Sequence, residues 1–340
     1  MKFISFNSYK GGACRTTTCY NTLPYLAKKL GATSAQPILV FDADLDSMGL
    51  TSLFHINRPK TDSKKLLPYS ARNLFVEDES GMITRRISRF FSVKQDSWYF
   101  NNFEKVGEHL GLEDNGAVLF CGVDTNAPTI TDDQFKHFAG NPPINALRRA
   151  LKTMPRDAQP KAVIFDCAAG IQMSTLRVLT VIERGVLCMR PTTQFRMGTE
   201  DYLLNWIPEE LKKAQGMTER PEIVLLPTSV ADINVPESDP NSKTAIKELK
   251  LMRKNAFDNI ERDIILQFES ERTRRDLRCE LNAQMIDIAN DEVGIPEIER
   301  FKWEEGEEDD LLFKNPHALT QREQKLKERY AKLAEILARE

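Results

Sequence analysis

The chain has 340 residues, 41% of them hydrophobic, which is enough to bury a substantial core in one large domain. Its formal net charge of −3 gives no global attraction to nucleic acid or anionic lipid, so any such contact has to come from a local patch. No apolar run approaches the roughly 20 residues that a membrane span needs, and the N-terminus enters a strand almost at once, leaving no room for a signal peptide. We therefore expect a cytoplasmic protein.

The N-terminal segment FISFNSYKGGACRTTT, residues 3–18, joins a short apolar strand to a glycine-containing loop and to three threonines at a helix start. Gly11 and Gly12 have no side chains, so the loop backbone can approach a ligand closely. The N–H groups of such a loop and the positive end of the helix dipole favour a bound polyphosphate, and a threonine hydroxyl at the helix start can hold Mg²⁺. The segment therefore predicts nucleotide binding.

Short apolar runs bounded by Gly, Pro or Asp recur along the chain, and we expect them to be strands buried on both faces. They cover residues 3–6, 38–41, 118–123, 163–165, 186–189 and 223–226. Helical patterns separate most of them, at residues 16–30 with Gly31 as a cap, at 145–153 and at 198–213. This alternation predicts an α/β fold, a mostly parallel twisted sheet flanked by helices, with ligands at the carboxyl ends of the strands.

Two further motifs lie at the ends of predicted strands. In PILVFDADLDSMGL, Asp42 and Asp44 follow the strand at residues 37–41. In KAVIFDCAAGI, Asp166 ends another strand, and Gly170 closes the turn that follows. Taken singly, either aspartate could merely cap a turn or the next helix. Three motifs in order, each at a strand end, instead indicate a nucleotide site.

The first loop departs from the pattern G-x-x-x-x-G-K-[ST], because Tyr9, Cys14 and Arg15 stand at its two glycines and its lysine. Lys10, directly before the glycine pair, resembles the extra lysine of the deviant Walker A loop K-G-G-x-G-K-[ST]-T, in its arginine variant. This loop is the mark of the ParA/MinD family of P-loop ATPases. The resemblance covers roughly residues 1–230 and implies a P-loop NTPase fold with ATP and Mg²⁺ as cofactors.

The resemblance also implies roles for the loop residues. Arg15 would bridge the β- and γ-phosphates, and Thr17 would contact the α-phosphate. Lys10 would reach across a dimer interface to the nucleotide of a second copy, so that activity would depend on an ATP-dependent homodimer. The expected nucleotide-binding residues are Lys10, Gly11, Gly12, Ala13, Cys14, Arg15, Thr16 and Thr17.

Metal-binding and catalytic residues are implied in the same way. Thr16 is the expected Mg²⁺ ligand, Asp42 would lie near the metal, and Asp166 would hold it through a water. Asp44 matches the residue that positions the attacking water. The expected catalytic residues are Lys10, Arg15 and Asp44.

Some positions depart from the family pattern. Cys14 replaces a glycine where unusual backbone angles are expected, so its Cβ could force the loop open or simply be tolerated. A thiol at a helix N-terminus could also allow redox control. Ala168 replaces the proline of the family's D-x-P-[AP]-G motif. The segment IVLLPTSV has Pro227 and Thr228 where relatives often place an asparagine that reads adenine, so adenine is expected from the resemblance alone.

We therefore expect an ATP-binding and ATP-hydrolysing dimeric switch of bacterial type, slow and stimulated by a partner protein encoded nearby, which signals to that protein or to DNA. The alternative is a non-hydrolysing nucleotide-binding scaffold or adaptor with the same fold. Asp44 favours hydrolysis, because a scaffold need not keep a water-positioning carboxylate. A metabolic or redox enzyme of the same superfamily is a third interpretation, although the six cysteines contain no C-x-x-C pair.

We assign residues 1–303 to the nucleotide-binding domain, with helical insertions at about 55–116 and 240–290. Three arginines combine with two phenylalanines at residues 84–91, and four arginines crowd residues 272–278. Either segment could contact DNA or an acidic partner. The simpler interpretations are an amphipathic element with its aromatic residues packed inward and a solvated helix face with internal ion pairs.

Residues 304–318 are expected to form an acidic linker, and residues 319–340 a C-terminal helix. Two series of apolar residues recur in this helix every seven positions, namely Leu319, Leu326 and Leu333, and Tyr330 and Leu337. The stripe predicts a contact with a partner helix or docking against the core. MinD relatives end in a membrane-binding helix, but acidic residues here offset the basic ones, so we do not expect membrane attachment.

Overall fold

The computed structural model describes residues 1–54, 70–75, 90–94, 97–123, 143–190, 192–207, 221–230, 255, 258, 295–296 and 321–339. Several predictions concern residues outside these ranges. These are the arginines at 85, 86 and 89, the acidic linker at 304–318, and all but two residues of the insertion at 240–290.

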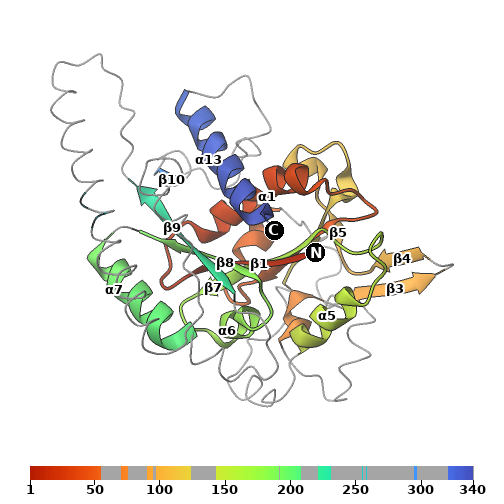
Figure 1. Cartoon of the computed structure of the whole chain (residues 1–340), viewed down its shortest axis with the longest axis horizontal. Coiled ribbons are helices and arrows are strands. Elements are labelled where there is room, and N and C mark those ends of the chain that lie inside the picture. Colours follow the sequence, from red (N-terminus) through yellow and green to blue (C-terminus); the bar gives the residue numbers. More distant parts are fainter. Residues whose placement is uncertain are drawn as a thin grey trace, which may run out of the picture.

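A sheet of eight strands forms the centre of the described part (Figure 1). Its order is β10 (Ile295–Pro296), β9 (Glu222–Val230), β8 (Arg184–Met189), β1 (Lys2–Ser8), β7 (Ala162–Ala169), β2 (Ile38–Ala43), β6 (Val118–Cys121) and β5 (Glu104–Lys105). Neighbouring strands are parallel except β5 and β6. The predicted mostly parallel sheet is therefore confirmed, and each predicted apolar run forms one of its strands.

The register of the central strands brings the acidic motifs together. β2 and β7 are almost entirely buried, as continuous apolar runs predict. Asp42 at the end of β2 lies opposite Asp166 on β7, and Phe6 of β1 pairs with Asp166 from the other side. Because the strands are parallel, their carboxyl ends share one edge of the sheet.

Helices cover both faces of the sheet. α1 (Arg15–Leu30) and α13 (Gln321–Ala338) lie on one face, and α5 (Pro143–Lys152), α6 (Met173–Leu179) and α7 (Thr193–Asp201) lie on the other (Figure 1). The short α2 (Gly49–Leu53) packs against α1. α1 ends as predicted, because Gly31 adopts a left-handed conformation with φ of 60° and its N–H bonds to the carbonyls of the last turn.

The prediction of a helix at residues 198–213 had the wrong start. α7 begins at Thr193, and Gly198 lies inside it. A Cβ on Gly198 would lie 1.9 Å from the Tyr9 ring, so close packing requires glycine within this helix. A π-helical turn, η5 (Tyr202–Trp206), continues α7. Residues 208–213 lie outside the described part.

The described part of the first insertion contains elements that the sequence did not predict. The hairpin of β3 (Phe91–Lys94) and β4 (Ser97–Phe100) forms a separate two-stranded sheet. This part also contains three 3-10 turns and the antiparallel edge strand β5. The turns are η2 (Ala71–Leu74), η3 (Glu108–Leu110) and η4 (Asn115–Ala117).

The C-terminal helix α13 docks along α1. The apolar stripe predicted from the heptad spacing is buried in this contact. The side chains of Leu326, Tyr330, Leu333 and Leu337 are at most 2% exposed. The Nη1 of Arg184 donates hydrogen bonds to the carbonyls of Ile336 (2.6 Å) and Leu337 (3.1 Å) in the last turn of α13. Leu319 lies outside the described residues.

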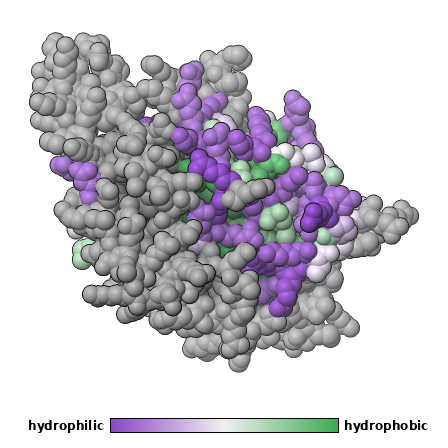
Figure 2. Space-filling model, viewed as in Figure 1, coloured by the Kyte–Doolittle hydropathy of each residue, from purple (hydrophilic) through white to green (hydrophobic). Residues whose placement is uncertain are grey.

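The surface in view is mostly polar. Figure 2 shows hydrophilic residues over most of the described part of this face, with hydrophobic residues in small patches between them. Within the described ranges, no helix is both long and apolar enough to cross a membrane.

Docking of α13 predicts the effect of truncating its stripe. Leu333→Ala should lower the free energy of unfolding by about 2 to 5 kcal/mol, because it leaves a cavity between two helices. Glu328→Ala, at an exposed position of the same helix, should change it by less than about 0.5 kcal/mol. Urea denaturation followed by circular dichroism measures both, and equal stabilities for the two variants would contradict the docking.

Candidate functional site

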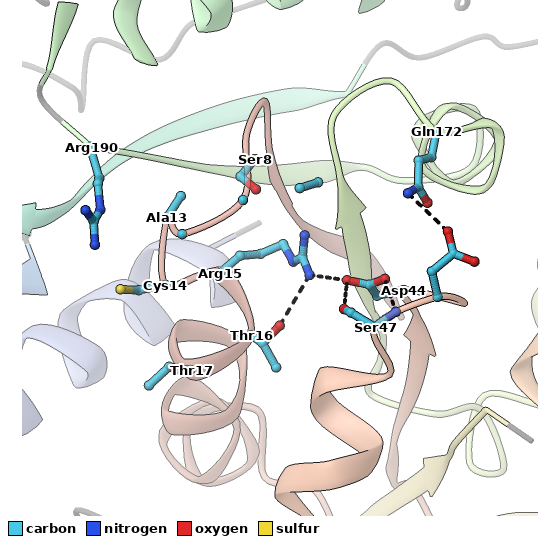
Figure 3. A pocket seen from close by; sticks show the side chains of 14 residues that line it. Ser8, Ala13, Cys14, Arg15, Thr16, Thr17, Asp44, Ser47, Gln172 and Arg190 are labelled. Atoms are coloured by element: carbon cyan, nitrogen blue, oxygen red, sulfur yellow. Dashed lines mark hydrogen bonds and ion pairs between the residues drawn. The ribbon is translucent and has the colours of Figure 1, made fainter. Parts of the chain in front are cut away.

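A pocket of about 520 Å³ lies at the carboxyl edge of the sheet. It gathers residues from all three sequence motifs and from the end of β8 (Figure 3). The residues that line it are Ser8, Gly11, Gly12, Ala13, Cys14, Arg15, Thr16, Thr17, Asp44, Asp46, Ser47, Ala169, Gln172 and Arg190. The predicted residues Lys10, Asp42 and Asp166 are not part of this lining.

The loop before α1 keeps a glycine-like backbone at Cys14. This residue has φ of 50° and ψ of 29°, in the left-handed region, and Gly12 has φ of 80°. A residue with a Cβ in that conformation costs about 1 kcal/mol or more relative to glycine. The Cys14 side chain is exposed and points away from Arg15 (Figure 3). The loop therefore keeps the backbone conformation of a glycine at position 14, and Cys14 is strained in it.

Arg15 is buried and bound to two carboxylates. Its Nη2 donates to Asp44 Oδ2 at 2.6 Å, and its Nε donates to Asp166 Oδ1 at 3.1 Å. Burial alone would lower the pKa of Arg15, but the charges of Asp166 and Asp44 raise it above its ordinary value. The remaining nitrogen, Nη1, makes no hydrogen bond to the described residues, so it can donate to a ligand.

Asp44 is fixed by the turn that follows β2. Ser47 donates to it twice, from its hydroxyl to Oδ2 at 2.5 Å and from its N–H to Oδ1 at 3.1 Å. Together with Arg15, these bonds orient the carboxylate at the pocket wall (Figure 3). The predicted water-positioning residue therefore faces the same cavity as the loop.

Asp42 points elsewhere. Its Oδ2 accepts hydrogen bonds from the N–H and the hydroxyl of Thr51, at 2.8 and 2.6 Å, and its Oδ1 accepts the N–H of Asp44. Burial, reinforced by the neighbouring Asp166, raises the pKa of Asp42 to about 7. Both oxygens are occupied by α2 and the β2 turn, so the geometry fits an anchor for that turn better than a metal ligand.

Asp166, unlike Asp42, has a carboxylate oxygen without a hydrogen bond to the described residues. It is fully buried, and its Oδ2 has no hydrogen-bond partner in the described structure. Burial raises the pKa of Asp166 to about 6, although Arg15 and the Thr16 hydroxyl act against this rise. A buried carboxylate oxygen next to a threonine hydroxyl fits Mg²⁺, which prefers oxygen ligands and keeps several of its waters.

Lys10 lies on the outer side of the loop. It is exposed, and its Nζ stands 5.9 Å from the centroid of the Phe195 ring on α7. The preceding Tyr9 packs against Gly198 and against the Tyr202 ring, at 6.4 Å between centroids. α7 therefore supports the loop through its contacts with Tyr9 and Lys10.

Sequence reasoning missed two polar residues of the pocket. Arg190 follows β8 and lies on the Cys14 side, whereas Gln172 follows β7 and donates to Asp46 Oδ2 at 3.4 Å on the Asp44 side (Figure 3). Arg190 directly follows β8, and Gln172 lies between the end of β7 and the start of α6. The rule that ligands bind at the carboxyl ends of parallel strands could have identified them.

The described cysteines other than Cys14 are buried and form no disulfide. Burial raises the pKa of Cys19, Cys121, Cys167 and Cys188, which makes these thiols unreactive. Among the described residues, no group of three or more His, Cys, Asp or Glu side chains could hold a metal ion by itself.

No protein-family model and no curated protein matches the sequence. Solved structures do match the fold. pNOB8 ParA is 14% identical with a TM-score of 0.52, and the match covers 99% of this chain and 96% of that chain. pNOB8 ParA bound to nonspecific DNA is 14% identical with a TM-score of 0.50, over 99% and 97% of the two chains. The septum site-determining protein MinD from Pyrococcus horikoshii, complexed with Mg-ADP, is 15% identical with a TM-score of 0.38, over 73% and 76%.

The described part of the chain therefore has the P-loop fold that pNOB8 ParA shows, as the resemblance of the three motifs implied. At this level of identity the comparison establishes the fold. The roles of individual residues depend on the geometry of the pocket.

The left-handed conformation of Cys14 predicts a stabilising substitution. Cys14→Gly should raise the free energy of unfolding by about 1 kcal/mol, because glycine adopts this conformation without strain. Cys14→Ala removes the thiol but keeps the Cβ, so it should match the wild type. Thermal denaturation distinguishes the two, and a Cys14→Gly protein no more stable than Cys14→Ala would show that Cys14 is not strained.

Proposed function

We propose that the protein is an ATP-binding and ATP-hydrolysing dimeric molecular switch of the ParA/MinD type. The observation that carries the proposal is the loop of residues 11–17, which lines a pocket at the start of α1 together with Asp44. Backbone N–H groups at a helix N-terminus suit a polyphosphate. The shared fold with pNOB8 ParA supports the same conclusion.

The residues of the pocket divide the task between them. Thr16, and Asp166 through a water, would hold Mg²⁺, which would offset the negative charge of the phosphates. Arg15 donates to the phosphates through its remaining N–H groups, and Arg190 adds a second positive charge on the Cys14 side.

Hydrolysis requires Asp44 to orient a water, which it does with a carboxylate oxygen that now accepts from Arg15 and Ser47. A phosphate competes with Asp44 for the guanidinium, because both are anions that arginine binds well. Turnover therefore depends on how far a phosphate bound at Nη1 weakens the bond between Arg15 and Asp44. Such a dependence accounts for slow hydrolysis that a partner protein stimulates.

The exposure of Lys10 supports the proposed dimer. Its ammonium group lies outside the pocket lining of its own subunit, at the edge of the loop. Across a two-fold interface it would reach the nucleotide of a second copy. ATP would then hold two copies together, and hydrolysis would release them.

In the cytoplasm, a partner protein encoded nearby or DNA would bind the protein according to its nucleotide state. DNA is a candidate because the pNOB8 ParA structure contains nonspecific DNA bound to a protein of this fold. The second candidate function is a scaffold that binds nucleotide without hydrolysis. The bonds that hold Asp44 to Arg15 and Ser47 favour this alternative, so turnover has to be measured separately from binding.

Isothermal titration with ATP and Mg²⁺ tests nucleotide binding by the loop of residues 11–17. The wild type should bind, and Arg15→Ala should weaken binding by at least about tenfold, because it loses a charge-assisted hydrogen bond to phosphate. Arg156→Ala removes an exposed arginine at the opposite edge of the sheet and should bind as the wild type does. Thermal melts confirm that each variant is folded. No heat of binding for the wild type would overturn the proposed function.

Asp44→Asn separates the switch from the scaffold. The amide keeps the shape of the side chain but orients water poorly, so phosphate release should fall by about 10²-fold or more while ATP binding is retained. With ATP, the variant should accumulate as a dimer in light scattering.

Equal phosphate release from the wild type and Asp44→Asn would favour the scaffold. The trapped dimer is also the form to titrate with duplex DNA in a gel-shift assay. Absence of salt-dependent binding there would remove DNA from the candidate partners.

A further inference from the structure

Thr228, near the end of β9, is hydrogen-bonded to the phosphate loop. Its hydroxyl donates to the carbonyl oxygen of Ala13 at 2.9 Å, although 215 positions separate the two residues. Thr228 is 0% exposed and Ala13 is 2% exposed. In the sheet order β9 and β1 are separated by β8, so this bond connects the loop after β1 to a strand that is not its neighbour.

The bond fixes the direction of one peptide group. The described backbone contains no cis peptide bond, so the Ala13 carbonyl and the Cys14 N–H point in opposite directions. The carbonyl faces Thr228 in the protein interior. The N–H of Cys14 therefore points away from β9, and Cys14 is a residue that lines the pocket.

The same peptide group sets the strained angle of Cys14. The φ of 50° at Cys14 is the rotation about its N–Cα bond, which starts at the nitrogen of this peptide. A relaxation of Cys14 to negative φ would turn the peptide and move the Ala13 carbonyl away from the Thr228 hydroxyl. The hydrogen bond therefore opposes the relaxation that the Cβ of Cys14 favours.

We propose that Thr228 is a positioning residue for the phosphate loop, which holds the Ala13–Cys14 peptide so that the Cys14 N–H faces the polyphosphate of a bound nucleotide. This inference rests on the proposed function. Thr228 then acts on phosphate binding, because its hydroxyl hydrogen is donated to the Ala13 carbonyl. The inference gives Thr228 no part in recognition of the base.

Two substitutions test the role. Thr228→Val has nearly the same shape but no donor, and Thr228→Ser keeps the donor. Hydrogen–deuterium exchange of the protein without nucleotide, read on the peptide that covers residues 9–17, should be faster in Thr228→Val and unchanged in Thr228→Ser. If Thr228→Val does not fold, Thr228→Ala replaces it in the same measurement. Exchange equal to the wild type would overturn the proposal, whether or not the protein binds nucleotide.

Titrations with Mg·ATP and Mg·GTP provide the readout that a structural role alone would not move. Thr228→Val should weaken the two affinities by the same factor, about five- to tenfold, as expected for one hydrogen bond. Thr228→Ser should restore both. A changed ratio of ATP to GTP affinity would assign Thr228 to the base and overturn the proposal, and so would unchanged affinities. If the wild type binds neither nucleotide, the proposed function fails, and the exchange data still show whether Thr228 holds the loop.

A double-mutant comparison isolates the link to Cys14. In the Cys14→Gly background the left-handed conformation carries no strain, so loss of the Thr228 hydroxyl should accelerate exchange of residues 9–17 less than in the wild type. The same acceleration in both backgrounds would show that Thr228 does not hold the strained peptide.

Discussion

The buried guanidinium of Arg15 connects the elements on which the site depends. It belongs to the first turn of α1 and binds Asp44 after β2 and Asp166 at the end of β7. A buried charge of this kind is tolerated only when it is paired and hydrogen-bonded, and removal of one partner would leave the others uncompensated. The start of α1 and the ends of both strands are therefore held in one arrangement. Arg15 and Asp44 of this arrangement line the pocket.

Much of this arrangement follows from the sequence. The continuous apolar runs predict buried parallel strands, and parallel strands place the aspartates and the glycine loop at one edge. The different orientations of the Asp42 and Asp44 side chains could not be predicted from the sequence. β2 ends at Ala43, so Asp44 enters a turn toward the pocket, whereas Asp42 is captured by Thr51 on α2. That contact depends on how α2 packs, which periodicity does not specify.

Other features escaped prediction because they depend on residues far apart in the chain. Gly198 looked like the start of a helix, yet it lies within α7 because Tyr9 occupies the space of its Cβ. Thr228 looked like a departure from a base-reading position, and its hydroxyl is bonded to Ala13. In both cases local propensity gave way to a tertiary contact with the loop. The loop is thus the feature to which distant positions are adapted.

A strained residue persists only where its surroundings determine its conformation. For Cys14 three contacts do so. Thr228 holds the preceding peptide, Arg15 holds the following turn through two carboxylates, and α7 supports the loop at Tyr9. Behind the loop, α13 covers α1 and keeps that helix in place. A loop fixed in this way loses little further conformational freedom when it binds phosphate, so more of the interaction energy is retained as affinity. The same contacts explain how a cysteine can occupy a glycine position without closing the pocket.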